Sequence, residues 1–223
     1  MPAGAADPRM GWVPAPRHGW VAPHIASEFP GLGIAWLEVD AKPGRSPEPV
    51  RRRLRDLSDR TYGSQAIRLR ERPIPWAYRV FYRQIGLDPD RTPTPVERLT
   101  LERLHDGGFR SNGMPADALN IAIVETGVAL RAFDAEGIQG QLCIRDSGPG
   151  ESLDGAAGEM AKGTLTIADD HRPIGLLFGE TAEGCRVERA SRRIAVAAVQ
   201  VNGVPQIAVE EALWMAAATL EAA

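Results

Sequence analysis

The sequence predicts an α+β fold, because its helical and strand-like segments are segregated along the chain instead of alternating. Windows with helical periodicity lie between residues 47 and 125, whereas short β-rich apolar runs lie mainly between residues 129 and 201. Regular alternation of strands and helices would instead predict a doubly wound parallel sheet. Hydrophobic residues make up 43% of the 223 residues and charged residues 25%, which is enough to build a core.

The first half opens with one strand and continues with helices. Residues 31–41 are apolar and rich in β-formers, which predicts a strand. Ser46-Pro47-Glu48 places a capping residue, a first-turn proline and an acid in the order typical of a helix start, and the helix is expected to end near Arg60. Aromatic and aliphatic residues between positions 76 and 85 predict a short, partly buried helix.

Two further helices and a series of strands follow. Thr94-Pro95-Val96-Glu97 is a capping-box pattern, and the helix that it opens is expected to end near Gly107. Residues 116–125 form another helical window, and residues 209–220 predict a final, largely apolar helix. Short strands separated by Gly, Asp and Glu turns are expected at residues 129–133, 141–145, 164–168, 174–178 and 194–201.

Composition also restricts the class of protein. No apolar run approaches 18 residues, so no membrane span is expected. Residues 1–22 are expected to form a flexible leader without a secretory signal, and residues 23–223 a single domain. Cys143 and Cys185 lie far apart and outside any CxxC pair, which favours a reduced cytoplasmic protein without a disulfide framework.

The basic residues are almost all arginines. The net charge of -3 argues against a strongly electrostatic nucleic-acid binder of the repressor type. All of the 26 basic residues except Lys42 and Lys162 are arginines. Several of them crowd one stretch: Arg51, Arg52, Arg53, Arg55, Arg60, Arg68, Arg70 and Arg72. They form either a solvated helix face or a local RNA-facing patch, since the guanidinium fork suits phosphate contacts.

Short catalytic motifs are absent from the sequence. It contains no HExxH, no GxSxG, no Walker loop and no dinucleotide fingerprint. Residues 148–151 (GPGE) are interpreted as a turn, because proline lacks an amide and the glutamate repels phosphate. The four histidines are scattered, so no metal site is expected. His171 after Asp169-Asp170 is either a polar turn or an acid–base group, and Cys185 is interpreted as a buried bystander.

A longer, ordered pattern begins at Arg110-Ser111. It resembles the B3/B4 domain of the beta chain of bacterial phenylalanyl-tRNA synthetase, in which an Arg-Ser pair precedes a helix carrying Asn and a strand ending in Ala-Phe-Asp. The matching positions keep the same spacing: Arg110, Asn120, Gly127, Phe133 and Asp134, followed by Gly140, Arg145, Gly150-Glu151, residues 165–169 and Phe178-Gly179-Glu180. Free-standing members of the family also show Tyr82-Arg83, Gly86, Asp88-Pro89, Arg91 and the capped helix at Thr94.

The resemblance covers roughly residues 78–201 and carries expectations about fold and function. It implies β-sandwich-like layers flanked by helices. In the synthetase this domain hydrolyses tyrosine wrongly attached to phenylalanine tRNA, which is an ester hydrolysis. The chemistry needs a positioned water, donors for the developing oxyanion and contacts to the terminal adenosine. For this chain the resemblance implies a hydrolase that acts in trans on an aminoacyl-tRNA or a related aminoacyl ester, without a cofactor.

Two alternatives belong to other functional classes. The first is a module that binds an amino acid or the 3′ end of an aminoacyl-tRNA without turnover. The second is a biosynthetic enzyme that uses an aminoacyl-tRNA as donor. The sequence specifies neither the amino acid nor the oligomeric state.

Site residues follow from the resemblance, position by position. Arg110, Arg131 and Gly179 are the expected catalytic residues, and Arg110 and Gly179 are expected to converge on one cavity. The expected substrate-binding residues are Asn120, Asp134 and Glu180.

Two positions depart from the synthetase pattern, and several of the matching residues could have a role in stabilising the fold instead of a role in the site. Arg131 replaces a histidine and cannot act as a base. The glutamate that recognises the tyrosine hydroxyl in the synthetase aligns near Ala197, which argues against tyrosine selection by that route. Asn120 and Asp134 could instead stabilise the fold through buried hydrogen bonds, and Arg145 could serve only to pair with Glu151 or Asp146.

Overall fold

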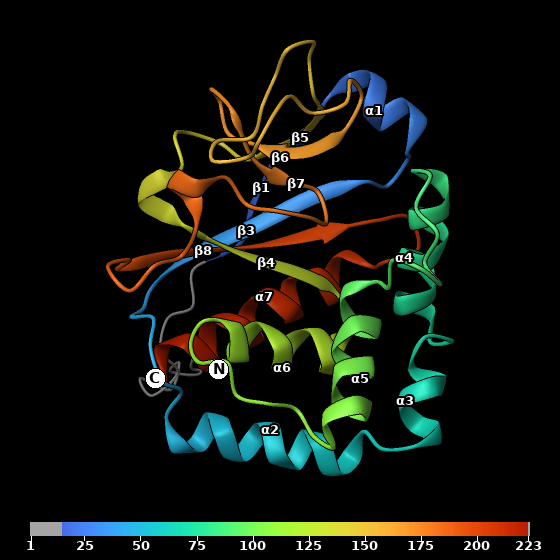
Figure 1. Cartoon of the computed structure of the whole chain (residues 1–223), viewed down its shortest axis with the longest axis vertical. Helices are drawn as coiled ribbons and strands as arrows, with labels where there is room; N and C mark the ends of the chain where they lie inside the picture. The colour runs from blue at the N-terminus through green and yellow to red at the C-terminus, as the bar shows by residue number, and fades with distance from the viewer. Residues whose placement is uncertain (1–14, 223) are drawn as a thin grey trace, which may run out of the picture.

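The computed structural model describes residues 15–222, without the side chains of residues 65 and 66. A central antiparallel sheet is covered by a second sheet on one face and by helices on the other (Figure 1). The strands of the central sheet are, in spatial order, β1 (Arg17–His18), β3 (Gly33–Asp40), β8 (Arg193–Gln200) and β4 (Ala129–Asp134). The layers confirm the predicted α+β, sandwich-like fold.

The outer sheet is smaller. Its strands are β2 (Trp20–Val21), β5 (Cys143–Asp146), β6 (Leu165–Ala168) and β7 (Pro173–Leu176), in this order. β2 runs parallel to β5, and the other neighbours are antiparallel. Two short 3₁₀ helices, Ala135–Gly137 and Glu183–Cys185, lie in the connections around this sheet.

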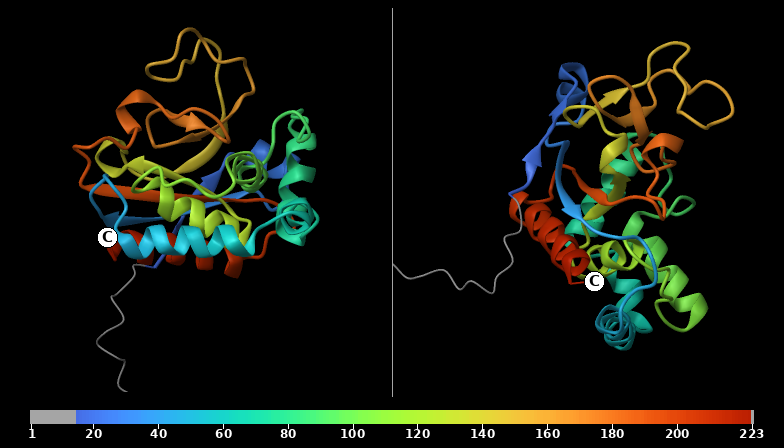
Figure 2. Two further views of the ribbon diagram at one scale, coloured as in Figure 1. Left: turned by 60° about the horizontal axis from the view of Figure 1, so that its bottom comes forward. Right: turned by 90° about the vertical axis from the view of Figure 1, so that its left-hand side faces the viewer.

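Two long helices pack against the other face of the central sheet. α6 (Ala116–Thr126) contacts β4, and α7 (Gln206–Glu221) contacts β3 and β8. α2 (Glu48–Arg60) lies outside α6, as the left view of Figure 2 shows. The remaining helices are α1 (Pro23–Glu28), α3 (Ser64–Leu69), α4 (Pro73–Gln84) and α5 (Pro95–Asp106). None of the helices described is long and apolar enough to cross a membrane.

The position of β8 explains its composition. A strand covered on both faces is expected to be apolar at every position instead of alternating. Residues 194–199 are completely buried, with helices on one side and the outer sheet on the other. β8 pairs with β3 along all eight residues, so the single strand predicted in the first half joins the sheet built by the second half.

The predicted leader requires a correction. Residues 1–14 lie outside the described residues, but β1 and β2 belong to the segment predicted to be flexible. Gly19 connects them, and its amide donates to the Ile34 carbonyl at 2.9 Å. A Cβ at Gly19 would lie 2.1 Å from the Leu142 carbonyl oxygen, so only glycine permits this close approach. Gly19, one of the small residues taken as a sign of flexibility, therefore fits between the two sheets.

The capping box predicted at Thr94 is confirmed. The Thr94 amide and hydroxyl donate to Glu97 Oε2 at 3.1 and 2.7 Å. The other oxygen of Glu97 accepts from the buried Arg79 at 2.5 Å, and Arg79 also pairs with Asp90 at 2.6 Å. The cap thus joins α5 to α4, and α4 forms one wall of the site described below.

Candidate functional site

A groove of about 670 Å³ opens between α1, the C-terminal end of α4 and the outer sheet. Cavities of this size accommodate an amino acid or a nucleoside. Its apolar surface is formed mainly by Ile25, Phe29, Ile85, Leu87, Leu165, Leu176, Leu177 and Phe178. Its polar side chains are His24, Glu28, Gln84, Thr92, Asp146, Lys162 and Thr164. Gly179, one of the residues predicted from the resemblance, also lines the groove.

A histidine–aspartate pair lies in the groove wall. Nε2 of His24, on α1, is 2.9 Å from Oδ1 of Asp146, the last residue of β5. With the proton on Nε2, the ring donates to the carboxylate and leaves Nδ1 as an acceptor for water. An imidazole oriented by a carboxylate can act as a general base, because the carboxylate stabilises the imidazolium that forms.

Sequence reasoning missed this pair. The two residues are 122 positions apart, and His24 is the second residue after the segment interpreted as a leader. The only local signal was Pro23 at the first position of a six-residue helix. The parallel pairing of β2 with β5 brings the two residues together, since it places the start of α1 beside the end of β5.

Gly179 lies in a tight turn that follows β7. Its amide donates to the Leu176 carbonyl at 3.3 Å, and the Leu176 amide donates to the Glu180 carbonyl at 2.9 Å. A Cβ at Gly179 would lie 2.9 Å from the Leu176 side chain, so the turn closes tightly against that residue. The Phe178 ring packs on Tyr82 of α4, with ring centroids 4.9 Å apart. The Gly179 amide is therefore used within the turn, and the residue forms part of the groove wall.

Arg131 supports the same turn from inside. Its guanidinium donates to the carbonyl oxygens of Leu176 and Glu180 and to Oγ1 of Thr181. Its Cζ lies 5.3 Å from the centre of the Phe133 ring. Burial, together with the nearby positive charge of Arg98, lowers the pKa of Arg131 to about 10. The structure thus brings Arg131 and Glu180 together, through the Glu180 backbone.

Ala197 is the neighbour of Arg131 on β8. The two residues are register partners, and Ala197 is completely buried. Its methyl side chain packs in the core and carries no hydrogen-bond acceptor.

Arg110 lies elsewhere. Its side chain is 72% exposed, and its Nε is 3.0 Å from Oδ2 of Asp106 at the end of α5. The connection between α5 and α6 is at the lower end of the molecule in Figure 1, whereas β7 and its turn are at the upper end. The structure therefore does not bring Arg110 and Gly179 to one cavity. The physical reason is that α5 runs away from the groove and carries the segment after it to the far side.

The two other predicted residues lie near the central sheet. Asp134 accepts from the Ser191 hydroxyl at 2.5 Å and from the Glu136 amide at 3.0 Å. These hydrogen bonds fit the alternative role of Asp134, which is to stabilise the fold. Asn120 is half-buried on α6, and its side chain forms no hydrogen bond with other described residues. Neither residue lines the groove.

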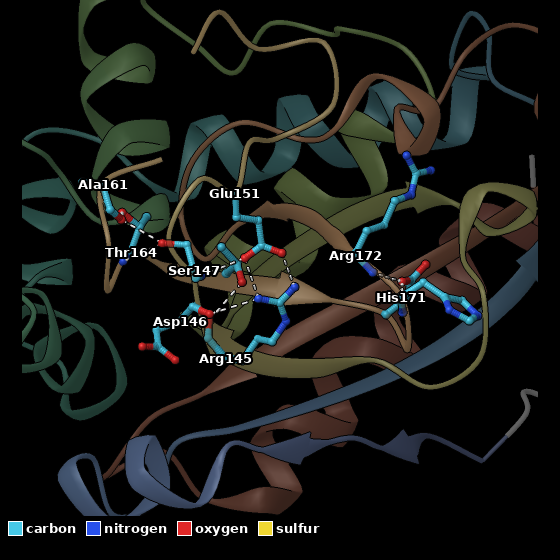
Figure 3. A network of polar contacts seen from close by, with 11 residues as sticks. Arg145, Asp146, Ser147, Glu151, Ala161, Thr164, His171 and Arg172 are labelled. Carbon is cyan, nitrogen blue, oxygen red and sulfur yellow. Dashed lines mark hydrogen bonds and ion pairs between the residues drawn. The ribbon is translucent and has the colours of Figure 1, made fainter. Parts of the chain in front are cut away.

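The loop after β5 contains a closed polar network (Figure 3). Arg145 donates to both carboxylate oxygens of Glu151, at 2.8 and 2.6 Å, and Glu151 also accepts from the Gly148 amide at 3.0 Å. Farther along, Asp169 Oδ1 accepts from the amides of His171 and Arg172, each at 2.8 Å. The structure therefore contains the predicted Arg145–Glu151 pair, and the segment around His171 is a polar turn.

The Arg145–Glu151 pair predicts a pH dependence of stability. Hydrogen bonds from Arg145 hold the pKa of Glu151 below its ordinary value of 4.5. A lowered carboxylate pKa stabilises the fold above the ordinary pKa, and this contribution is lost as the pH falls through the lowered value. We expect the free energy of unfolding, measured by urea titration between about pH 5 and about pH 3, to fall less steeply in Glu151→Gln than in the parent. Glu211→Gln, at an exposed position of α7, should follow the parent, and parallel slopes for all three proteins would contradict the prediction.

Half of the clustered arginines are engaged in ion pairs. Arg51 and Arg55 pair with Glu48 at 2.7 and 2.5 Å. Arg53 and Arg60 pair with Glu125 of α6 at 2.7 and 3.1 Å. These four residues fit the interpretation of a solvated helix face.

Neither cysteine is suited to nucleophilic catalysis. Both thiols are free and buried. Burial raises the pKa of Cys143 to about 11 and also raises the pKa of Cys185. Within residues 15–222, no cluster of three His, Cys, Asp or Glu side chains could hold a metal ion.

Comparisons with known proteins add independent information. Residues 77–211 match a family model described as the B3/4 domain. The chain is 38% identical over 95 residues to the phenylalanine–tRNA ligase beta subunit of Streptomyces avermitilis, which covers 41% of the chain and 11% of the relative. It is 36% identical over 101 residues to that of Methylococcus capsulatus and 31% identical over 121 residues to that of Tropheryma whipplei. These matches cover 43% and 53% of the chain and 12% of each relative. Asp146 and Gly179 lie within the residues that match the family model, and His24 lies before them.

Proposed function

Because this chain belongs to the B3/4 domain family, we propose that it hydrolyses the ester bond of an aminoacyl-tRNA, or of a related aminoacyl ester, at the groove lined by Gly179. The observation that carries this proposal is the pair formed by His24 and Asp146 beside an apolar surface. Such a groove offers an apolar contact for an amino-acid side chain and a base for water.

The reaction follows from these groups. The side chain of the esterified amino acid packs against Phe178, Leu177 and their neighbours. His24 takes a proton from a water molecule as the water oxygen bonds to the ester carbonyl carbon. The bond from that carbon to the ribose oxygen then breaks, and His24 returns the proton to the ribose oxygen. The products are a free amino acid and the 3′ end of the RNA. The Lys162 ammonium on the rim offers positive charge near the developing oxyanion.

We further propose that the reaction takes place in trans, in the cytoplasm, on aminoacyl-tRNA released by another enzyme. This proposal is supported by the upstream signature from Tyr82-Arg83 to Glu97, which resembles free-standing members of the family. The matched segments cover only 11–12% of the length of the three relatives described above.

A panel of aminoacyl-tRNAs tests the function. Tyrosine on phenylalanine tRNA should be included with other correct and incorrect pairings, and the release of amino acid should be followed over time. We expect at least one ester to be hydrolysed much faster than in buffer alone. If every ester decays at its spontaneous rate, the hydrolase proposal is rejected.

One observation favours a second candidate function, which is binding without turnover. Neither Arg110 nor Arg131 lines the groove, although both were predicted to be catalytic. Calorimetry with a non-hydrolysable aminoacyl-adenosine amide separates the two candidates. Binding heat together with stable aminoacyl-tRNAs would favour the binding module, whereas the absence of heat would count against this groove as a ligand site.

A further inference from the structure

The outer face of α4 is exposed and leads toward the groove. Arg72, Trp76, Val80 and Arg83 follow one another at spacings of four, four and three residues, which places them on one side of the helix. The Trp76 side chain is 49% exposed and Val80 39%. The opposite side of α4 carries its two tyrosines and Phe81, which are buried. We call these four exposed residues the α4 stripe.

Positive charge is concentrated around this stripe. Residues 68–91 contain six arginines and three acids, in a chain whose net charge is -3. Two of the acids, Asp88 and Asp90, pair with Arg91 and Arg79. Among the residues that the structure describes, the other arginines of this segment form no ion pair: Arg68, Arg70, Arg72 and Arg83. They differ in this respect from Arg51, Arg53, Arg55 and Arg60 of α2.

The stripe combines this charge with an accessible aromatic ring. The Arg83 guanidinium lies 5.8 Å from the centre of the Trp76 ring. Single-stranded nucleic acids bind to surfaces of this kind, because bases stack on aromatic rings and on guanidinium planes while arginines neutralise the phosphates. A duplex does not present its base faces, so an exposed tryptophan favours an unpaired strand.

The stripe is continuous with the groove. α4 follows the right-hand edge of the molecule in Figure 1, from near α3 up to the level of α1. Gln84 and Ile85, which follow Arg83 directly, line the groove. The twelve residues of the helix span about 18 Å, which is long enough to support several nucleotides. A strand lying along the stripe would reach the groove at its end.

We propose that the α4 stripe binds the single-stranded 3′ end of an RNA whose terminal, aminoacylated nucleotide occupies the groove. The identity of the terminal group rests on the proposed function, whereas the RNA contact rests on the charge, the aromatic ring and their position. The proposal therefore assigns the RNA contacts to the α4 stripe and not to α2, where four of the five arginines are paired with carboxylates.

Binding of a fluorescent twelve-nucleotide RNA ending in CCA tests the stripe. We expect Trp76→Ala to weaken binding by roughly 5- to 150-fold, which is the range for the loss of one stacked base. Arg83→Glu should weaken binding about tenfold and reduce the slope of log K against log salt by about 0.7, as expected for one lost phosphate contact. Arg52→Glu is the matched control and should stay within about twofold of the parent. Arg52 is an exposed arginine of α2 that forms no ion pair with the residues described by the structure.

Several outcomes would overturn the proposal. They are the absence of RNA binding by the parent, parental affinity in both stripe variants, and a loss of affinity in Arg52→Glu as large as that in Arg83→Glu. A change in self-association of the stripe variants without a change in RNA affinity would also reject it. Circular dichroism and thermal unfolding identify any variant that has lost its fold.

A second measurement separates this proposal from the proposed reaction. Trp76 lies eight residues before the groove residue Gln84, which is about 12 Å along the helix. Trp76→Ala should therefore hydrolyse an aminoacyl-adenosine at the parental rate and show a raised KM only for aminoacyl-tRNA. If no ester is hydrolysed but the stripe variants still lose RNA affinity, the reaction is wrong and the binding surface stands. If the short ester is hydrolysed and no RNA binds, the surface is wrong and the reaction stands.

Discussion

His24→Ala is expected to lower kcat for aminoacyl-ester hydrolysis by roughly 10²- to 10⁴-fold, the usual contribution of a positioned general base. The variant removes the imidazole that is 2.9 Å from Asp146 and leaves the apolar surface of the groove intact. KM should change little, because the histidine acts on water. Single-turnover release of amino acid from a preformed aminoacyl-tRNA measures the effect on the chemical step.

Matched controls are available within the chain. His105 is also within hydrogen-bond distance of a carboxylate, that of Asp106 at 2.8 Å, but it lies at the end of α5 and outside the groove. His105→Ala should retain the parental kcat. Arg110→Ala should also retain it, because Arg110 does not line the groove. A large loss in Arg110→Ala with normal activity in His24→Ala would move the active site to the α5–α6 connection and reject the assignment of His24.

Asp117→Ala should destabilise the fold by roughly 3–5 kcal/mol, because it leaves several buried donors without their charged acceptor. The Asp117 carboxylate is completely buried and accepts three hydrogen bonds. They come from the hydroxyls of Ser46 and Ser111 at 2.6 and 2.5 Å and from the Asn112 amide at 2.7 Å. Together they tie the segment before α2 and the connection after α5 to the first turn of α6. For a chain of this size the melting temperature should fall by roughly 6–20 °C.

Urea unfolding and thermal scans measure this loss. Asp117→Asn keeps an acceptor oxygen and should recover part of the stability. Asp59→Ala, at an exposed position of α2, should unfold within about 0.5 kcal/mol of the parent. Equal stability of Asp117→Ala and the parent would show that the carboxylate does not hold these segments together. Ser111 of the predicted Arg110-Ser111 pair thus has a structural contact in this chain.

Local signals in the sequence were sufficient for most of the secondary structure. The capping box at Thr94 joins residues only three positions apart, and helical and strand periodicities extend over short stretches of sequence. Both kinds of pattern can therefore be recognised without knowledge of the fold. The Arg145–Glu151 pair could be foreseen for the same reason, since its members are six residues apart. The ordered motif from Arg110 to Glu180 indicated the family, and the family model confirms it.

The positions and contacts of individual side chains could be determined only from the tertiary structure. Arg131 turns inward because the outer sheet covers that face of β4 and supplies carbonyl acceptors 45 to 49 residues away. Arg110 leaves the site because α5 carries it to the other end of the molecule.

The sequence by itself thus determined the α+β class, most elements and the family, because these depend on short-range periodicity, caps and the order of motifs. The tertiary structure decided which polar groups meet. It placed His24 beside Asp146, across 122 residues. It also paired four of the five α2 arginines with carboxylates, while Arg72 and Arg83 of the α4 stripe have no ion pair among the described residues. The physical reason is that a hydrogen bond or an ion pair depends on distances of about 3 Å, and only the packing of sheets and helices sets these distances between remote parts of the chain.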